Sequence, residues 1–187
     1  MRLLFLFIVL VSNIVFGQSI PPLTDPIDSI FKSKFPKVYG EIGHPYPDFE
    51  IKRENRTINS KTIQGKVVLI NFWFKACLPC MAEMEGLNTL YKKLANNKDF
   101  IFLSIAKDNK ENIRNVIRKY NLAFAVYSLS ENECKRLNFG SGYPTSIILD
   151  KTGVIKNIHV GGITDKDGAS ERVMYTLLPE IQSLLGN

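Results

Sequence analysis

The sequence predicts an α/β domain, with a central mixed β-sheet flanked by helices on both faces. Two observations lead to this prediction. Apolar runs that suit buried strands alternate along the chain with segments whose apolar residues recur at helical spacing. Near the C-terminus, the tight turn Lys151-Thr152-Gly153 joins two strands, 145–150 and 154–160, into a hairpin. A hairpin is antiparallel, whereas strands connected through a helix are parallel, so both kinds of pairing are expected in one sheet.

Residues 1–17 are predicted to be a secretory signal peptide. Arg2 is followed by an apolar run over 3–10, and the small residue Gly17 stands where a signal peptidase would cut. The run is shorter than the roughly 20 residues that a membrane-spanning helix needs. Cleavage after Gly17 and export to the periplasm or cell envelope are therefore expected, with an uncleaved membrane anchor as the alternative.

Residues 18–46 are expected to form a linker or a loosely ordered extension. The segment is rich in proline and has no clear period apart from a short candidate helix around 27–35. The compact domain is expected over 47–187. It would open with a small hairpin or two short edge strands, 49–51 and 56–58, where apolar and polar residues alternate.

The centre of the domain is predicted from one long apolar run. Residues 67–74 are almost continuously apolar and rich in β-branched side chains, which is typical of a central strand covered on both faces. A helix over 79–94 follows, with Met84, Leu87 and Leu90 among the apolar residues at helical spacing. The later predicted elements are a strand at 100–105, a helix at 112–120, a weak strand at 123–127, a short helix at 131–137 and a last helix at about 169–185.

Composition and charge exclude some functional classes. The net charge of +6 comes from basic residues spread along the chain, whereas nucleic-acid binding would ask for a stripe or a tail of them. With only three cysteines, an exported chain cannot be a disulfide-stapled scaffold and must fold by burying a core. The length suits one domain. A monomer without a cofactor and without a nucleic-acid partner is expected.

The most informative motif is Cys77-Leu78-Pro79-Cys80, at the junction between the strand 67–74 and the following helix. A Cys-x-x-Cys at such a junction indicates a redox pair. The helix N-terminus, with its unpaired N–H groups and partial positive charge, favours the reactive thiolate. Cys77 is expected to attack a substrate disulfide, and Cys80 is then expected to attack the Cys77 sulfur and release the reduced substrate.

Two inert alternatives compete with the redox pair. A permanent disulfide between Cys77 and Cys80 closes a four-residue loop and would be worth only about 2 kcal/mol. A structural zinc site needs four ligands, and besides the pair only Cys134, His44 and His159 are left, so no metal site is expected. Cys134 is expected to be a half-buried packing residue, and the two histidines are expected to be structural.

Several short stretches occur together in a recognisable order and spacing. They are Pro47-Asp48-Phe49, Gly65-Lys66-Val67-Val68-Leu69-Ile70-Asn71-Phe72-Trp73, Cys77-Leu78-Pro79-Cys80, Glu83-Met84 and Gly142-Tyr143-Pro144-Thr145-Ser146. On these stretches the chain resembles the thioredoxin superfamily, specifically the exported TlpA/ResA-like thiol-disulfide oxidoreductases, from about residue 47 to the C-terminus. The resemblance implies a thioredoxin fold with an N-terminal β extension, a dithiol/disulfide active site, and protein or small-molecule disulfides as substrates.

The resemblance also suggests which group accepts the proton of Cys80. In thioredoxins, a buried aspartate stands six residues before the first cysteine, and the matching residue here is Asn71, which does not titrate. Proteins of the TlpA/ResA type often have a glutamate where this chain has Glu83. Because Glu83 lies on the same helix face as Cys80, it is the candidate general base. The alternative is that Glu83 lies at the surface and only complements the helix N-terminus.

Pro144 matches the cis proline that packs against the redox pair in the family. The preceding residue, Tyr143, would offer its backbone N–H and C=O groups to an extended substrate. Trp73 is expected to be core and a wall of the active site, and these three residues are the substrate-binding candidates. The family usually has a tryptophan where Ala76 stands and a helix-kinking proline where Glu85 stands, so a flat hydrophobic contact for substrate is missing.

These features predict an exported thiol-disulfide oxidoreductase that reduces protein disulfides and is itself recharged by a membrane electron donor. Two alternatives stay open. One is a peroxide-reducing enzyme of the related peroxiredoxin type, whose active site has a threonine where this chain has Phe74. The other is a thioredoxin-fold binding module without turnover, in which partner capture would survive replacement of both Cys77 and Cys80.

Overall fold

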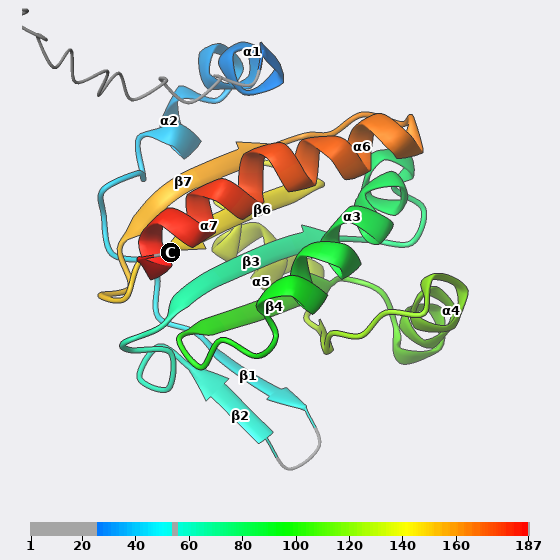
Figure 1. Ribbon diagram of the computed structural model, residues 1–187, viewed down its shortest axis with the longest axis horizontal. Coiled ribbons are helices and arrows are strands. Elements are labelled where there is room, and N and C mark those ends of the chain that lie inside the picture. The colour runs from blue at the N-terminus through cyan, green and yellow to red at the C-terminus, as the bar shows by residue number, and fades with distance from the viewer. Residues whose placement is uncertain (1–25, 54–55, 187) are drawn as a thin grey trace, which may run out of the picture.

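The computed structural model describes residues 26–53 and 56–186, and Figure 1 shows how their helices and strands are arranged. The predicted signal peptide, 1–17, lies outside these residues, and so does the start of the predicted extension. Of the helices in the described residues, none combines the length and the apolar character needed to cross a membrane.

A five-stranded sheet forms the centre of the fold, in the order β5-β4-β3-β6-β7. Strands β3, β4 and β5 are parallel to one another, whereas β6 runs antiparallel to both β3 and β7. The expected mixed sheet is therefore confirmed. The strand bounds are Val67–Trp73 for β3, Phe100–Ala106 for β4, Val126–Ser128 for β5, Thr145–Leu149 for β6 and Ile155–Val160 for β7.

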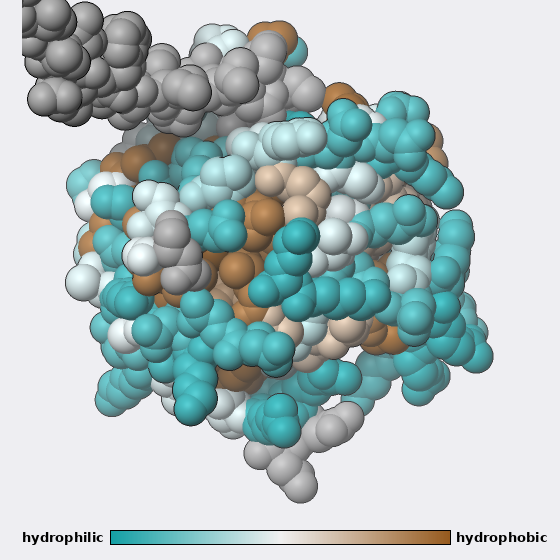
Figure 2. All heavy atoms as spheres, in the orientation of Figure 1, coloured by the Kyte–Doolittle hydropathy of each residue, from teal (hydrophilic) through white to brown (hydrophobic). Residues whose placement is uncertain are grey.

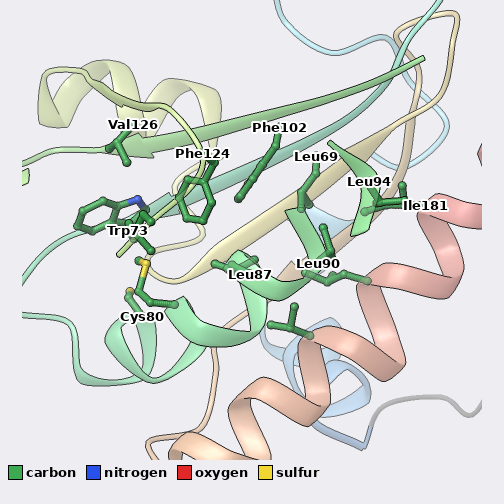
Figure 3. Close-up of a cluster of buried hydrophobic side chains, with 14 of the residues drawn as sticks. Leu69, Trp73, Cys80, Leu87, Leu90, Leu94, Phe102, Phe124, Val126 and Ile181 are labelled. Atoms are coloured by element: carbon green, nitrogen blue, oxygen red, sulfur yellow. The ribbon is translucent and has the colours of Figure 1, made fainter. Parts of the chain in front are cut away.

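β3 is the middle strand of the sheet, paired with β4 on one edge and β6 on the other, and both of its faces are covered. All of its residues are buried. Leu69 and Trp73 belong to one apolar cluster (Figure 3), whereas Val68, Ile70 and Phe72 belong to a second cluster on the opposite face. This alternation follows from the two-residue period of a strand. The continuous apolar run in the sequence therefore correctly indicated a central strand.

Helices cover both faces of the sheet, as expected. The first apolar cluster is closed by α3 (Leu78–Leu94), α4 (Lys110–Tyr120) and the C-terminal helices. The second is closed by α5 (Glu131–Leu137) and by the antiparallel hairpin of β1 (Glu50–Arg53) and β2 (Arg56–Asn59), which confirms the predicted hairpin. In Figure 1, α3 and α7 lie in front of the sheet and α5 lies behind it. Hydrophilic residues cover most of the front face, and hydrophobic ones show in smaller areas between them (Figure 2).

The predicted last helix, about 169–185, is divided into α6 (Lys166–Arg172), a π-helical turn η1 (Val173–Leu177) and α7 (Leu178–Leu185). Pro179 explains this division. Proline has no N–H to donate to the carbonyl four residues earlier, that of Tyr175, and its ring crowds that carbonyl. The hydrogen bonds shift by one residue instead, and the N–H of Leu178 bonds to the carbonyl of Val173.

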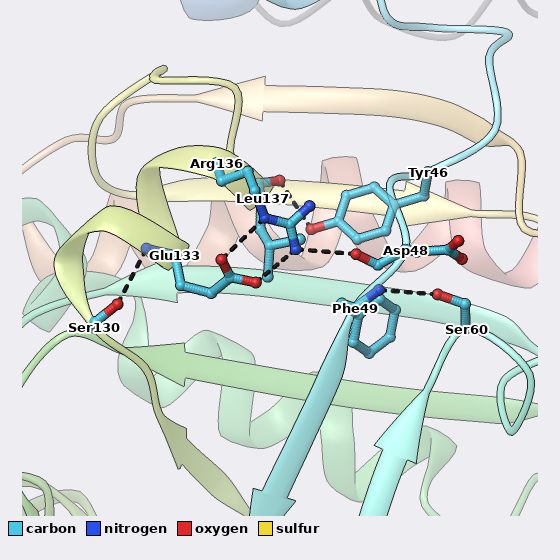
Figure 4. A network of polar contacts seen from close by, with 8 residues as sticks. All are labelled: Tyr46, Asp48, Phe49, Ser60, Ser130, Glu133, Arg136 and Leu137. Carbon is cyan, nitrogen blue, oxygen red and sulfur yellow. Dashed lines mark hydrogen bonds and ion pairs between the residues drawn. The ribbon is translucent and has the colours of Figure 1, made fainter.

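Polar contacts fix the start of the hairpin to α5 (Figure 4). Arg136 donates to the backbone carbonyl of Asp48 at 2.9 Å and also bonds Glu133 on its own helix at 2.9 Å. Tyr46 donates its hydroxyl to the carbonyl of Leu137 at 2.8 Å. These contacts hold the chain just before β1 over the second apolar cluster.

The residues before the hairpin form two helices, α1 (Pro26–Lys34) and α2 (Pro36–Tyr39), and both contact β7. The short helix expected around 27–35 is therefore confirmed. Phe31 packs so closely on Gly161 that a side chain there would collide with its ring, and Val38 is buried. The division of the chain at residue 47 stays a prediction, and the described part of the extension lies in contact with the sheet.

Candidate active site

The two motif cysteines are joined in a disulfide at the start of α3. β3 ends at Trp73, and the loop that follows places Cys77 at the N-cap of the helix. The two Sγ atoms are 2.03 Å apart, and the N–H of Cys80 donates to Cys77 Sγ at 3.2 Å. Pro79 stands in the first turn, where its missing N–H leaves no helical bond unmade. After reduction, the N–H groups of this turn would stabilise a Cys77 thiolate.

The two cysteine residues differ slightly in exposure. Cys77 is 6% exposed, whereas Cys80 is 1% exposed. Both cysteines are buried, and Cys77 is the more exposed of the two; its role as the attacking sulfur stays a prediction. The next residue, Leu78, is 72% exposed and presents an apolar side chain beside the disulfide.

The Tyr143–Pro144 peptide bond is cis, as the family resemblance implied. A Cβ added to Gly162 would lie 3.1 Å from Pro144 Cγ, 3.3 Å from Pro79 Cβ and 2.7 Å from Glu83 Oε1. Pro144, the motif proline and the glutamate therefore surround one point. Only glycine fits there without displacing the carboxyl group.

The ring of Tyr143 belongs to an aromatic and cationic group close to the motif. It meets the ring of Phe74 edge to face, with ring centroids 5.2 Å apart. Lys107 Nζ lies 4.6 Å from the centroid of Phe74 and 5.2 Å from that of Tyr143. The Phe74 carbonyl accepts a hydrogen bond from the N–H of Cys77 at 3.1 Å, which places the group next to the disulfide. We call Phe74, Lys107 and Tyr143 the aromatic ledge.

Trp73 has no exposed surface. Its indole N–H donates to Ser104 Oγ at 2.8 Å, and its ring lies next to Cys80 in the core (Figure 3). This position agrees with the expectation of a wall behind the site. Because Trp73 is fully buried, it has no surface for direct contact with a docked substrate, and a part in substrate binding stays a prediction.

Glu83 is 4% exposed, and the surface alternative for it is wrong. Its Oε1 lies 3.5 Å from Nη1 of Arg172 on α6. Burial raises the pKa of the carboxyl to about 8, although the charges of Arg172 and His159 act to lower it. A carboxyl that titrates near neutral pH can both accept and release a proton, as a general base at this place would have to do.

A row of buried polar residues crosses the sheet on the face that packs against α3. Ser104, Asn71, Ser146 and His159 stand opposite one another on β4, β3, β6 and β7. Asn71 Nδ2 donates to Ser146 Oγ at 3.0 Å. At the end of the row, His159 Nε2 lies 3.0 Å from Glu180 Oε2 on α7. The polar row therefore connects the centre of the sheet with the C-terminal helix.

Sequence reasoning missed the partners of Glu83. Arg172 gave no signal, because it lies 89 residues further along the chain. His159 was expected to be structural. The available signal was its place in β7 between two buried apolar residues, since a buried polar side chain in such a strand requires a partner.

Cys134 was expected to be half-buried, but it is fully buried. It lies in the second apolar cluster, on the face of the sheet opposite to Cys80. Burial raises the pKa of its thiol to about 11, so the thiol stays protonated at neutral pH. Within residues 26–53 and 56–186, no group of three or more His, Cys, Asp or Glu side chains could hold a metal ion.

Comparison with known proteins agrees with this geometry. A family model described as the AhpC/TSA family matches residues 42–158. The thioredoxin-like protein YneN of Bacillus subtilis is 36% identical over 129 residues, which cover 67% of this chain and 75% of that protein. The thiol-disulfide oxidoreductase ResA of Oceanobacillus iheyensis is 31% identical over 134 residues, which cover 68% of this chain and 69% of that protein.

A solved structure supports the fold. A thiol:disulfide interchange protein of the thioredoxin family from Chlorobium tepidum has a TM-score of 0.59 at 23% identity, and the match covers 76% of this chain and 96% of that one. The family match spans the disulfide, Glu83 and the cis proline. The chain belongs to the AhpC/TSA family, and it is a thioredoxin-fold thiol-disulfide oxidoreductase.

Proposed function

We propose that this enzyme reduces disulfides of exported proteins, with Cys77 as the nucleophile, Cys80 as the resolving thiol and Glu83 as the group that takes the Cys80 proton. One observation carries the proposal. A disulfide stands at the start of α3, with Cys77 more exposed than Cys80, on the helix that also carries a buried carboxyl with a pKa of about 8. The reverse reaction uses the same groups, so the redox potentials of the partners set the direction.

In the first step, the Cys77 thiolate attacks one sulfur of a substrate disulfide. A bond forms between Cys77 Sγ and that sulfur, and the S–S bond of the substrate breaks. The released sulfur leaves with the electron pair and takes a proton from water. The N–H groups in the first turn of α3 stabilise the thiolate before the attack.

In the second step, the Cys80 thiol passes its proton to the Glu83 carboxylate and attacks Cys77 Sγ. The Cys77–Cys80 disulfide forms, the mixed disulfide breaks, and the second substrate sulfur leaves as a thiolate that water protonates. Two electrons have then moved from the enzyme dithiol to the substrate. Asn71 cannot take the proton, because a carboxamide does not titrate.

The substrate is proposed to bind in extended form beside Pro144, pairing with the backbone N–H and C=O groups of Tyr143. The aromatic ledge would border it on one side, with the charge of Lys107. Leu78 would supply an apolar contact from its exposed side chain. This contact takes the place of the flat hydrophobic surface that is missing at Ala76.

The oxidised enzyme has to be reduced again after each turnover. We assign this step to a membrane-bound dithiol donor outside the cytoplasm, and we place the enzyme in the periplasm or cell envelope as a monomer. The charge and the apolar run of residues 1–17 support export. Fractionation of cells that express the full chain would locate it, and recovery with cytoplasmic proteins would contradict export.

Trapping of mixed disulfides tests the proposed reaction. A Cys80→Ser variant mixed with cell-envelope extract should accumulate partners on Cys77 that dithiothreitol releases, whereas Cys77→Ser should accumulate none. The released proteins are then the substrates. Capture that persists when Cys77 and Cys80 are both replaced would instead support a binding module without turnover.

A peroxide assay separates the peroxiredoxin alternative. Phe74 stands where that active site has a threonine, and its ring packs on Tyr143. With dithiothreitol as donor, the enzyme should therefore consume hydrogen peroxide no faster than the Cys77→Ser variant. Rapid consumption that depends on Cys77 would favour a peroxidase.

A further inference from the structure

We propose that His159 and Glu180 form the route by which the proton taken up by Glu83 reaches solvent. The inference rests on the proposed role of Glu83 as the base for Cys80. The route runs from Glu83 on α3, through a small cavity, to His159 on β7 and then to Glu180 on α7. It gives a part in turnover to a histidine that sequence analysis expected to be structural.

A route is needed because the reacting groups have little contact with water. The Glu83 residue is 4% exposed, and the Cys80 residue that supplies the proton is 1% exposed. Pro79 and Pro144 close around the carboxyl at Gly162, so apolar atoms cover the side nearest to the motif. After each turnover, the proton therefore has to leave through polar groups.

A cavity of about 10 Å³ lies next to the carboxyl. Its polar side chains come from Glu83, Arg172, Ser146, His159 and Thr176. The volume is at the lower limit for one water molecule, and a buried water needs two to four polar partners, which this lining offers. One water at this place would link the carboxyl of Glu83 to the imidazole of His159.

The outer end of the route is a hydrogen-bonded pair between β7 and α7. His159 Nε2 lies 3.0 Å from Glu180 Oε2, and the other carboxylate oxygen accepts a hydrogen bond from Asn157 at 3.0 Å. The side chain of His159 is 2% exposed, whereas that of Glu180 is 32% exposed. An imidazole can take up a proton at one nitrogen and release one from the other. His159 can therefore pass a proton from the cavity to Glu180, which is in contact with water.

Arg172 holds the inner end of the route in place. Its guanidinium donates to the carbonyl of Gly161 at 3.1 Å and lies 3.5 Å from Glu83. Because arginine stays protonated, Arg172 positions the carboxylate and does not carry the proton. Among the described side chains, the charged or titratable groups that face Glu83 are thus Arg172 from α6 and His159 from β7, with Glu180 beyond them.

The inert alternative is that His159 and Glu180 only tie β7 to α7. A tie of this kind contributes to the free energy of unfolding and leaves the pH dependence of disulfide exchange unchanged. A proton route makes the resolving step depend on both residues. It also allows a small diffusible base to replace them, which a purely structural contact does not.

The test uses His159→Gln and Glu180→Gln in the full chain, because glutamine keeps hydrogen-bonding groups and does not titrate. Trp73 is the single tryptophan and lies next to Cys80, so its fluorescence can report closure of the disulfide. Stopped-flow measurements should show the resolving step slowed about tenfold near pH 7 in both variants, less than the 10²–10⁴ that a general base itself contributes. Added imidazole should restore most of the rate.

His44→Gln and Glu171→Gln are matched controls, because both side chains are exposed and lie outside the route. They should keep the parent rate at every pH. An unchanged rate and pH profile in folded Glu180→Gln would overturn the inference, and so would a slowed rate that imidazole does not restore. Should His159→Gln fail to fold, Glu180→Gln carries the test alone, since that change is made at a partly exposed position.

A Glu83→Gln variant separates the two proposals. If it slows the resolving step while Glu180→Gln and His159→Gln do not, the route is wrong and the role of Glu83 stands. If Glu83→Gln itself leaves the resolving step unchanged, the proposed base is wrong, and the route has no proton to carry.

Discussion

The burial of Glu83 should make the oxidised protein less stable as the pH rises. The native carboxyl has a pKa of about 8, whereas the ordinary value, which applies to the unfolded chain, is 4.5. Between these two pH values, the unfolded carboxyl is ionised while the native one holds its proton, so ionisation favours unfolding. The stability associated with a protonated Glu83 is therefore complete below about pH 4.5 and is lost progressively up to about pH 8.

A Glu83→Gln substitution isolates this effect, since the amide has the shape of the protonated acid and does not titrate. One pKa unit corresponds to 1.36 kcal/mol, so the shift from 4.5 to about 8 amounts to a change on the order of 5 kcal/mol. The free energy of unfolding of the variant, relative to the parent, should rise by about this amount between the two pH values.

Urea unfolding of both oxidised proteins at a series of pH values measures the difference. It should widen by about 1.4 kcal/mol per pH unit and level off above about pH 8. Glu85→Gln is the matched control, because this acid is exposed on the same helix and should give a curve parallel to the parent. Parallel curves for Glu83→Gln would refute the conclusion that burial keeps the carboxyl protonated.

Three further substitutions test the packing around the site. Gly86→Ala should lower the free energy of unfolding by about 1 to 3 kcal/mol, because the added Cβ would lie 2.8 Å from Ser170 Cα where α3 meets α6. An unchanged thermal midpoint would contradict this close approach. Gly162→Ala should slow the reduction of a small disulfide more than it lowers the thermal midpoint, since its Cβ would lie 2.7 Å from Glu83 Oε1. An exchange rate equal to that of the parent protein would show that displacement of the Glu83 carboxyl does not affect disulfide exchange. Cys134→Ala should leave exchange unchanged and lower stability, because this thiol is buried in the core; a slower exchange rate would give Cys134 a part in the reaction.

The strands and helices could largely be predicted because their signals are local. The apolar run of β3, the helical spacing in α3 and the short segment of α5 each depend on residues within one element. The break in the C-terminal helix was missed, although its cause, Pro179, is also local. The helical spacing of the apolar residues continues through Pro179, and this spacing carries no information on the carbonyl that loses its N–H donor there.

The environment of Glu83 could not be predicted in the same way. Sequence spacing placed it on one helix face with Cys80, but a helix face can point to solvent or to a neighbouring element. The decision depends on Arg172 and His159, which reach the carboxyl from α6 and β7. Gly162 lets the Glu83 carboxyl approach Pro144 and Pro79, because a side chain at this position would collide with the carboxyl and crowd both prolines. No sequence motif indicates this role, which is seen only in the contact distances.

Asn71 does not titrate and Glu83 is buried, and together these two residues affect the order of disulfide closure and proton release in the resolving step. Asn71 keeps a hydrogen-bonding side chain in the polar row, but the titrating group lies on α3, on the same face as Cys80. A Cys80 thiolate and a Glu83 carboxylate would repel each other, so the thiolate raises the pKa of Glu83 and keeps the proton on the carboxyl. Once Cys80 has lost its charge in the new disulfide, this repulsion is gone and the pKa of Glu83 falls again. Closure of the disulfide thereby returns the pKa of Glu83 to about 8, and the fraction of carboxyl groups that then release the proton rises with pH.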